Sequence, residues 1–167
     1  MVKSERKKAN MTGDSIHYYI YRTPQGPLAI AANNDGICRV SFGTADCSGL
    51  AKPTPLTNRA ATELLEFFAG KRTVFDLPLA PQGSEFQRAV WRACDAIPFR
   101  QTRTSAEIAE SLGNPRSYRS VGAAVRKNPL AVLVPSHRVV DARGVPLASP
   151  LQAKRAEQLL ALERTRA

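Results

Sequence analysis

The pattern of apolar residues changes along the chain near Pro81. Before this point, over residues 17–42, short apolar runs are separated by the turn signals Pro24–Gly26 and Asn33–Gly36, which is typical of antiparallel strands. After it, apolar residues recur at helical spacing. Because Pro81 and Gly83 separate the two patterns, we expect two lobes and no sheet that continues from one into the other.

We expect the first lobe, residues 15–82, to be a small α/β unit that follows a flexible basic tail at residues 1–14. The strands come first, and residues 44–56 are loop-like in composition. A helix is predicted over residues 57–69, with Thr57 as its cap. The buried face of this helix is expected to carry Leu64, Leu65 and Phe68.

The second lobe, residues 83–167, is predicted to be mainly helical. A short buried strand is expected over residues 130–134, and the inner face of the first helix is expected to carry Phe86, Val90, Trp91 and Cys94. Helices are predicted over residues 84–96, 105–112, 117–126 and 153–163. The second and third of these, joined by a tight turn, have the outline of a helix-turn-helix. The expected class is therefore α+β: a small antiparallel sheet lobe, then a mainly helical lobe with a helix-turn-helix.

Composition narrows the class of protein. With 167 residues and 43% hydrophobic residues the chain can fill a core, which excludes a wholly disordered protein. The sequence contains no run of about 18 apolar residues, so no membrane span is predicted. The charged residues at the start are not followed by an apolar stretch, as they would be in a signal peptide. The three cysteines, Cys38, Cys47 and Cys94, are an odd count without a CxxC pair. This favours a reducing cytoplasm and no structural metal, and we expect no cofactor.

Positive charge is concentrated in the second half of the chain. Residues 1–85 carry 10 basic and 8 acidic groups, net +2, whereas residues 86–167 carry 14 basic and 6 acidic groups, net +8. Such a half-chain suits a polyanion, because neutralising phosphates releases counterions. A generally basic protein without such a partner is the alternative.

The densest group of chemically capable residues is Pro135-Ser136-His137-Arg138, which follows an apolar run. A serine–histidine hydrolase is one interpretation. It is disfavoured because neighbours in an extended chain point to opposite faces, so His137 would not reach the hydroxyl of Ser136. There is also no G-x-S-x-G motif. A structural role for His137 fits the bare sequence equally well.

Residues 135–139, Pro-Ser-His-Arg-Val, resemble the Pro-Cys-His-Arg-Val signature of the O6-alkylguanine-DNA alkyltransferases, with serine in the cysteine position. Three longer stretches are similar to the same family in the same order, so the resemblance covers about residues 18–163. They are TPQGPLAIAANNDGICRVSF, FFAGKRTVFDLPLAPQGSEFQRAVWRACDAIPF and AEIAESLGNPRSYRSVGAAVRKNP. The resemblance implies the alkyltransferase fold and duplex DNA containing O6-alkylguanine as partner.

The resemblance also implies how DNA would be bound. In the family the second helix of the pair enters the minor groove, and an arginine fills the gap left by a flipped base. Arg119 matches that arginine, and Ala123 and Ala124 would allow close approach to the groove. The other matching DNA-binding residues are Arg116, Ser117, Arg126 and Lys127, which would contact or lie beside phosphates. For these basic residues a solvated helix face is the alternative.

The reacting site is implied in the same way. Ser136 takes the acceptor position, His137 matches the histidine that activates the acceptor through water, Glu163 matches the glutamate that orients this histidine, and Asn128 matches an asparagine that braces the site. The base pocket would include Ser105, Val134, Pro135 and Ser149. Glu163 could otherwise be a surface residue in the last turn of its helix.

Three departures from the family pattern bear on activity. Serine replaces the acceptor cysteine at position 136, Ser105 stands where the family often has tyrosine, and Ala148-Ser149-Pro150-Leu151-Gln152 replaces a Tyr-x-Gly-Gly loop. A hydroxyl is a far weaker nucleophile than a thiolate, so we expect no alkyl transfer.

Three hypotheses remain open. The first is a non-catalytic sensor like the alkyltransferase-like proteins, which bind the lesion and flag it for excision-repair proteins. The second is a one-turnover alkyltransferase inactivated by a cysteine-to-serine substitution, and the third is a DNA-binding protein that reads no damage. In each case we expect a cytoplasmic monomer, nucleoid-associated if bacterial.

Overall fold

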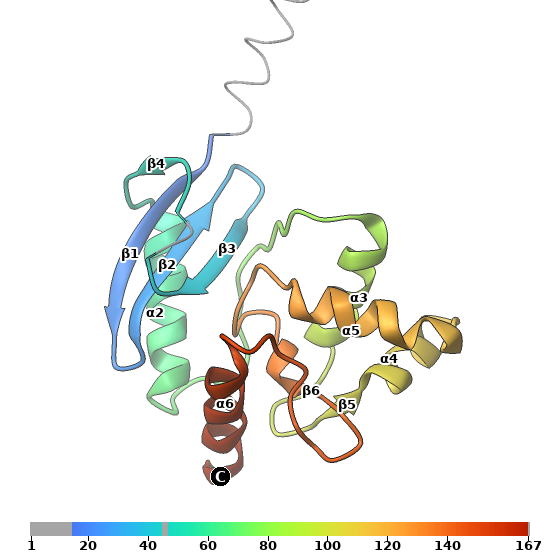
Figure 1. Cartoon of the computed structure of the whole chain (residues 1–167). Coiled ribbons are helices and arrows are strands. Elements are labelled where there is room, and N and C mark those ends of the chain that lie inside the picture. Colours follow the sequence, from blue (N-terminus) through green and yellow to red (C-terminus); the bar gives the residue numbers. More distant parts are fainter. Residues whose placement is uncertain (1–14, 45–46, 167) are drawn as a thin grey trace, which may run out of the picture. The chain divides into compact units, whose positions relative to one another are not determined.

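The computed structural model describes residues 15–44 and 47–166 and divides the chain into two compact units, Met1–Pro81 and Gln82–Ala167. The predicted tail, residues 1–14, lies outside the described residues. Over the described part, the fold combines a small sheet with five α-helices (Figure 1), which confirms the predicted α+β class. No described helix is long and apolar enough to cross a membrane.

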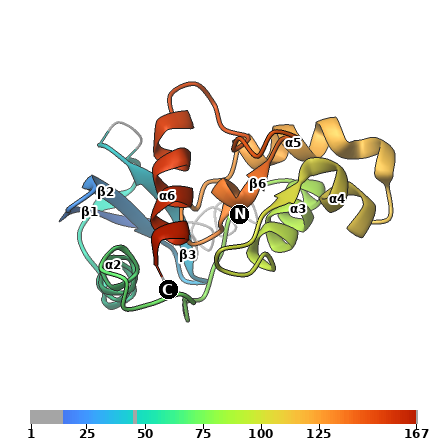
Figure 2. The ribbon, with the colours of Figure 1, turned by 90° about the horizontal axis from the view of Figure 1, so that it is seen from below.

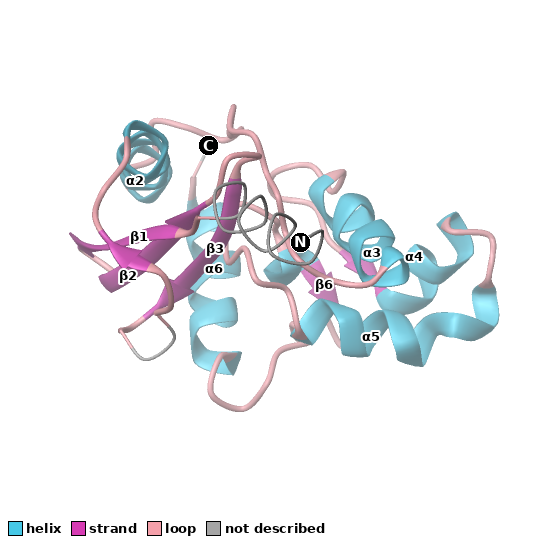
Figure 3. Ribbon diagram, turned by 90° about the horizontal axis from the view of Figure 1, so that it is seen from above, coloured by secondary structure: helices cyan, strands magenta, loops and turns pink. Residues whose placement is uncertain are grey.

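The first unit is built on a four-stranded sheet. Its strands are β1 (His17–Thr23), β2 (Gly26–Ala32), β3 (Ile37–Phe42) and β4 (Leu50–Ala51), in the order β3-β2-β1-β4. The first three are antiparallel neighbours, as predicted, and helix α2 (Pro55–Phe68) lies along one face of the sheet (Figure 3). β4 corrects the prediction of a loop over residues 44–56, because it pairs in parallel with β1.

Helix α2 begins before its predicted start. Thr54 is the cap: its hydroxyl accepts from the backbone N–H of Thr57 at 3.2 Å, and the hydroxyl of Thr57 accepts from the backbone N–H of Thr54 at 2.8 Å. Thr57 is therefore the third helical residue and fully buried, not the cap. Leu65, expected in the core, is 38% exposed, and the buried apolar side chains are Ala60, Ala61, Leu64, Phe67 and Phe68.

Four helices of the second unit begin and end within two residues of their predicted bounds. They are α3 (Glu85–Asp95), α4 (Ser105–Ser111), α5 (Tyr118–Arg126) and α6 (Ala153–Thr165). The 3-10 turn η1 (Pro115–Ser117) joins α4 to α5, and both α3 and α4 pack on α5 (Figure 2). The short strands β5 (Arg103–Thr104) and β6 (Val139–Val140) pair in parallel, with the 3-10 turn η2 (Ser136–Arg138) directly before β6. Phe86, predicted to face inward, is 39% exposed, and Leu112, which follows α4, is 37% exposed.

Residues 130–134 form a buried turn, so the prediction of a strand there is wrong. The backbone N–H of Val134 donates to the carbonyl of Leu130 at 3.0 Å, and Val132 has a left-handed φ of 69°. A β-branched residue adopts that conformation only when its surroundings enforce it. Leu130, Val132, Leu133 and Val134 are nevertheless all buried, and this is why the apolar run resembles a strand in the sequence.

Trp91 joins α3 to α5 in the core of the second unit. The indole is 3% exposed, and its N–H donates to the carbonyl of Ala124 at 2.9 Å. A Cβ added at Gly83 would lie 2.5 Å from this ring, so the absence of a side chain at position 83 lets the chain pass over the indole. The position of α5 therefore depends on a residue 33 positions earlier in the sequence.

We expect Trp91→Phe to lower the free energy of unfolding by about 1–2 kcal/mol, because the carbonyl of Ala124 loses a buried donor. Chemical denaturation of the full chain measures this. Phe86→Leu, on the exposed side of the same helix, is the control and should change the free energy by less than about 0.5 kcal/mol. Equal losses in the two variants would contradict the role given to the indole N–H.

Candidate functional site

The side chain of Asn128 organises the turn that precedes Ser136. Its carbonyl oxygen accepts from the backbone N–H of Leu130 at 2.9 Å, and its amide nitrogen donates to the carbonyl of Val134 at 2.9 Å and to the hydroxyl of Ser136 at 3.1 Å. One amide thus pairs the polar backbone of a buried turn and orients the hydroxyl at its end. Asn128 and Ser136, both predicted site residues, are in direct contact.

His137 and Glu163 form a second contact of the predicted site. Both are buried, at 4% and 1% exposure, and the Nε2 of His137 is hydrogen-bonded to Glu163. Glu163 therefore does not lie at the surface. The other carboxylate oxygen accepts from the backbone N–H of Arg100 at 3.0 Å and from the Nε of Arg138 at 2.9 Å. Both oxygens of the buried carboxylate therefore have hydrogen-bond donors, from three different residues.

Arg138 is a site residue that the sequence reasoning missed. Its guanidinium binds Glu163, donates to the carbonyl of Ile97 at 2.7 Å and lies 5.8 Å from the centre of the Phe99 ring. The signal for it was present, because an arginine inside a largely apolar run is buried only when it is paired. Arg138 holds the carboxylate that in turn holds His137.

Burial and pairing set the protonation states of this group. Burial lowers the pKa of His137, and the hydrogen bond and charge of Glu163 oppose that effect only in part. Burial alone would raise the pKa of Glu163, but hydrogen bonds from His137, Arg138 and the Arg100 backbone bring it to about 2. At neutral pH the pair is therefore a neutral imidazole and a carboxylate. Because a carboxylate only accepts, Nε2 carries the hydrogen and Nδ1 is the basic nitrogen.

The two buried cysteines are not part of this group. Burial raises the pKa of the Cys94 thiol to about 12, and it also raises the pKa of Cys38. Cys94 lies in the core on α3, and Cys38 belongs to β3 of the first unit. Neither thiol is ionised at neutral pH, and the residue directly before His137 carries a hydroxyl.

Helix α5 presents an exposed stripe of basic residues. Arg119, Ala123 and Arg126 are exposed and follow each other at spacings of four and three, which places them on one side of the helix. Arg116 and Lys127, at either end, are exposed as well. Ser117 is half-buried and bonds back to the carbonyl of Asn114 at 2.7 Å.

Ala124 requires a correction. It was expected beside Ala123 at the DNA, but it is 3% exposed and faces the core, where its carbonyl binds Trp91. Neighbouring residues on a helix are about 100° apart, so one side of α5 cannot expose both alanines. Ala123 alone provides the small residue on the exposed stripe.

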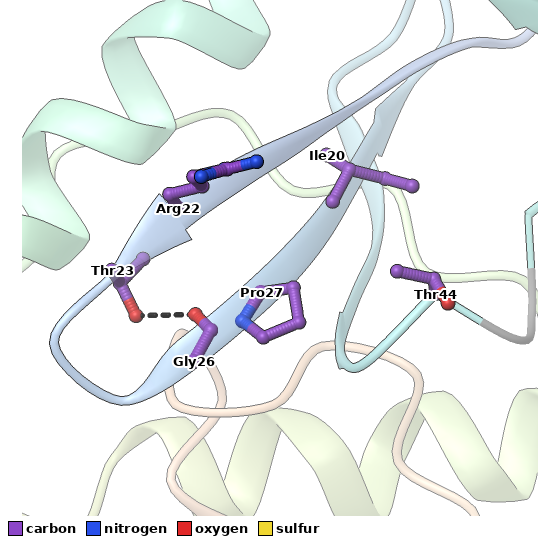
Figure 4. A pocket seen from close by; sticks show the side chains of 6 residues that line it. All are labelled: Ile20, Arg22, Thr23, Gly26, Pro27 and Thr44. Carbon is purple, nitrogen blue, oxygen red and sulfur yellow. Dashed lines mark hydrogen bonds between the residues drawn. The ribbon is translucent and has the colours of Figure 1, made fainter.

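The predicted base-pocket residues are spread over three segments of the second unit. Ser105 is the first residue of α4 and Ser149 lies in the loop before α6, and both are half-buried; Val134 and Pro135 are buried beside Ser136. A separate open cavity of about 600 Å³ lies in the first unit and contains none of them (Figure 4). It is lined by Ile20, Arg22, Thr23, Gly26, Pro27 and Thr44. Among the described residues, no group of three His, Cys, Asp or Glu side chains could hold a metal ion.

Two family models match this chain and together span nearly all of it. The 6-O-methylguanine DNA methyltransferase ribonuclease-like domain matches residues 16–81, and the DNA binding domain of the same methyltransferases matches residues 85–165. The chain belongs to this alkyltransferase family. The Asn128–Ser136 and His137–Glu163 contacts and the basic stripe all lie in the part that matches the DNA binding domain.

Individual relatives agree with this assignment. The methylated-DNA–protein-cysteine methyltransferase of Methanosarcina acetivorans is 39% identical over 155 residues, which cover 89% of this chain and 98% of the relative. The constitutive enzyme of Bacillus subtilis is 38% identical over 132 residues, covering 74% and 80%. The crystal structure of the Mycobacterium tuberculosis O6-methylguanine methyltransferase matches with a TM-score of 0.83 at 34% identity, covering 91% of this chain and 94% of that chain.

DNA binding is a property of the family. A Mycobacterium tuberculosis relative was solved in complex with DNA and matches this chain with a TM-score of 0.81 at 35% identity, covering 90% and 94%. The alkyltransferases are DNA-repair proteins, and the Methanosarcina and Bacillus relatives are named as methylated-DNA–protein-cysteine methyltransferases.

The buried pair makes stability depend on pH in two windows. The folded-state pKa of His137 lies below its ordinary value of 6.5, so the unfolded chain binds more protons just below pH 6.5 and stability falls on acidification. Glu163, with a pKa near 2, adds a second loss as pH falls from about 4.5 toward 2.

We expect His137→Gln to reduce the slope of the free energy of unfolding against pH in the upper window, just below pH 6.5. The reduction is at most about 1.4 kcal/mol per pH unit, because one titrating group is removed. Denaturant unfolding between pH 7.5 and pH 5.5 measures the slope, which is separate from any loss of absolute stability. The original chain, measured over the same pH series, is the reference. If His137→Gln had the same slope as the original chain, a buried neutral His137 would be excluded.

Proposed function

We propose that this protein binds duplex DNA containing O6-alkylguanine, turns the alkylated base out of the stack, and holds it without accepting the alkyl group. The observation that carries the proposal is Ser136. Its hydroxyl is held by Asn128 directly before His137, and the resemblance of residues 135–139 to the Pro-Cys-His-Arg-Val signature assigns it the position of the acceptor thiol.

Alkyl transfer from O6 is a displacement at a saturated carbon, for which the nucleophile must be strong. A cysteine is suited to this because its thiol, with an ordinary pKa of about 8.5, ionises readily beside a histidine. A serine hydroxyl is far less acidic, and the lowered pKa of His137 makes its imidazole a weaker base than usual. A neutral hydroxyl next to a weakened base does not supply the alkoxide that the displacement would need.

The same arrangement suits binding. Because Asn128 donates to the oxygen of Ser136, the hydroxyl hydrogen remains for an acceptor on a bound base. Loss of the nucleophile leaves the stripe of Arg119, Ala123 and Arg126 unchanged. In this proposal Arg119 replaces the flipped base, while Arg116, Arg126 and Lys127 neutralise phosphates.

The loop before α6 supports a pocket for larger adducts. Ala148–Gln152 has no aromatic residue and no glycine, and the side chain of Leu151 is 98% exposed. A rim without an aromatic wall leaves room for alkyl groups larger than methyl. The bound protein would then mark the lesion for excision-repair proteins in the cytoplasm, or on the nucleoid of a bacterium, and would act as a monomer.

A second candidate is a one-turnover alkyltransferase whose acceptor cysteine has been replaced. Relatives named as methyltransferases match along nearly their whole length, and the contact between His137 and Glu163 is intact. A DNA-binding protein without damage recognition is the third candidate, and a comparison of lesion and undamaged duplexes separates it from the first two.

Restoring the thiol tests the proposed loss of chemistry. We expect the original chain to gain no methyl group from a duplex with O6-methylguanine, as measured by intact mass, because no thiolate lies beside His137. Ser136→Cys shows whether the rest of the site is intact: one methyl per molecule means that the serine alone blocks transfer. Ser136→Ala is the control and should also gain nothing. Methylation of the original chain at Ser136 would overturn the proposal.

Arg119 and Lys127 should have different roles in binding. Arg119→Ala is expected to reduce the preference for an O6-methylguanine duplex over the undamaged duplex, because a flipped base then leaves an unfilled gap. Lys127→Ala is expected to weaken both complexes alike and to reduce the slope of log affinity against log salt by about 0.9, the value of one phosphate contact. Fluorescence anisotropy over a salt series measures both effects. Equal losses of lesion preference in the two variants would exclude base replacement by Arg119.

A further inference from the structure

The exposed stripe of α5 begins beside an aromatic residue. Tyr118 is the first residue of the helix, its side chain is 44% exposed, and the guanidinium carbon of Arg119 lies 5.8 Å from the centre of its ring. This is within the range of a cation–π contact. The Tyr118 hydroxyl makes no hydrogen bond to any residue that the structure describes. The side chain of Tyr118 therefore interacts with Arg119 through its ring.

Arg119 has no acidic partner in the described part of the chain. Its guanidinium makes a cation–π contact with the Tyr118 ring. Arg138 is held at the same distance from Phe99 but is also paired with Glu163 and with the carbonyl of Ile97. The contrast matters because a carboxylate would occupy the N–H donors of an arginine, whereas a ring leaves the charge unneutralised and provides no oxygen acceptor.

The ring lies at the edge of the stripe and does not cover it. At about 100° per residue, Tyr118 falls on the side of the buried Gly122, next to the side that carries Arg119, Ala123 and Arg126. The ring can therefore restrict the arginine while Ala123 stays open for close approach of a DNA groove.

We propose that Tyr118 is a positioning residue for Arg119: its ring restricts the guanidinium before DNA is bound and so increases the preference for a duplex with a flipped alkylated base. The inference rests on the proposed role of Arg119 in replacing that base. A long arginine side chain loses rotamer freedom when it is inserted between bases, and part of that loss is avoided when the side chain is already held. An exposed cation–π contact corresponds to about two- to fivefold in an equilibrium constant.

The test uses the full chain and two matched variants. Tyr118→Phe keeps the ring and Tyr118→Leu removes it while keeping an apolar side chain. Anisotropy is measured with an O6-methylguanine duplex and with the same duplex undamaged. The lesion preference is the ratio of the dissociation constant of the undamaged duplex to that of the O6-methylguanine duplex. We expect Tyr118→Phe to keep this ratio and Tyr118→Leu to lower it about two- to fivefold, with binding to undamaged duplex unchanged. In an Arg119→Ala background, Tyr118→Leu should have no further effect on the ratio.

A second measurement is independent of DNA. The side-chain Nε–Hε resonance of Arg119 in the free protein should carry a ring-current shift that Tyr118→Phe retains and Tyr118→Leu loses. Circular dichroism of each variant shows whether α5 is still formed.

The outcomes separate the inference from the proposed function. If the original chain does not prefer the lesion duplex, the proposed function fails and the inference falls with it. If it does prefer the lesion but Tyr118→Leu keeps or raises the ratio, the inference alone is wrong, because the ring then does nothing or competes with DNA for Arg119. An unchanged Arg119 resonance in Tyr118→Leu would also overturn it.

Discussion

One buried carboxylate organises the second unit. Glu163, near the end of α6, binds His137 and Arg138 of η2 and the backbone N–H of Arg100. Taking a carboxylate out of water costs several kcal/mol unless strong partners replace the water. The fold must therefore bring three separate segments to one point, and the imidazole of His137 is oriented as a consequence. The geometry of the site comes from an interaction that the folded chain needs for its own stability.

Asn128 organises the uncharged part of the site in the way that Glu163 organises the charged part. Its amide pairs the backbone of the turn at residues 130–134, in which Val132 has a left-handed conformation, and it ends on the hydroxyl of Ser136. An oxygen at position 136 accepts this bond without disturbing the turn. In the proposed change from transfer to binding, a serine at position 136 therefore keeps both the fold and the basic surface of α5.

Helix α5 has a buried face that packs in the core and an exposed face that carries basic residues. The inward side is held by apolar contacts and by the bond from Trp91 to the carbonyl of Ala124, while the outward side carries Arg119 and Arg126 around a small residue. A rigid helix presents its charges at fixed spacing, which suits phosphates, but base replacement needs one long side chain in a defined place. The ring of Tyr118 supplies a local restraint for that side chain, which the helix backbone alone cannot provide.

The sequence by itself determined the features that depend on near neighbours. It predicted α3 and α5 to within one residue, because the helical spacing of apolar residues is a local signal, and it singled out the arginines that α5 exposes. Only the tertiary structure decided the rest. The apolar run at residues 130–134 is compatible with a strand or with a buried turn, and the hydrogen bonds from Asn128 favour the turn. Ala123 and Ala124 are the same residue type, and only the packing of α5 on Trp91 determines that Ala124 is the buried one. His137 and Glu163 are 26 residues apart, and no local pattern pairs them, because the bond forms only when α6 packs beside η2 and excludes water from both groups.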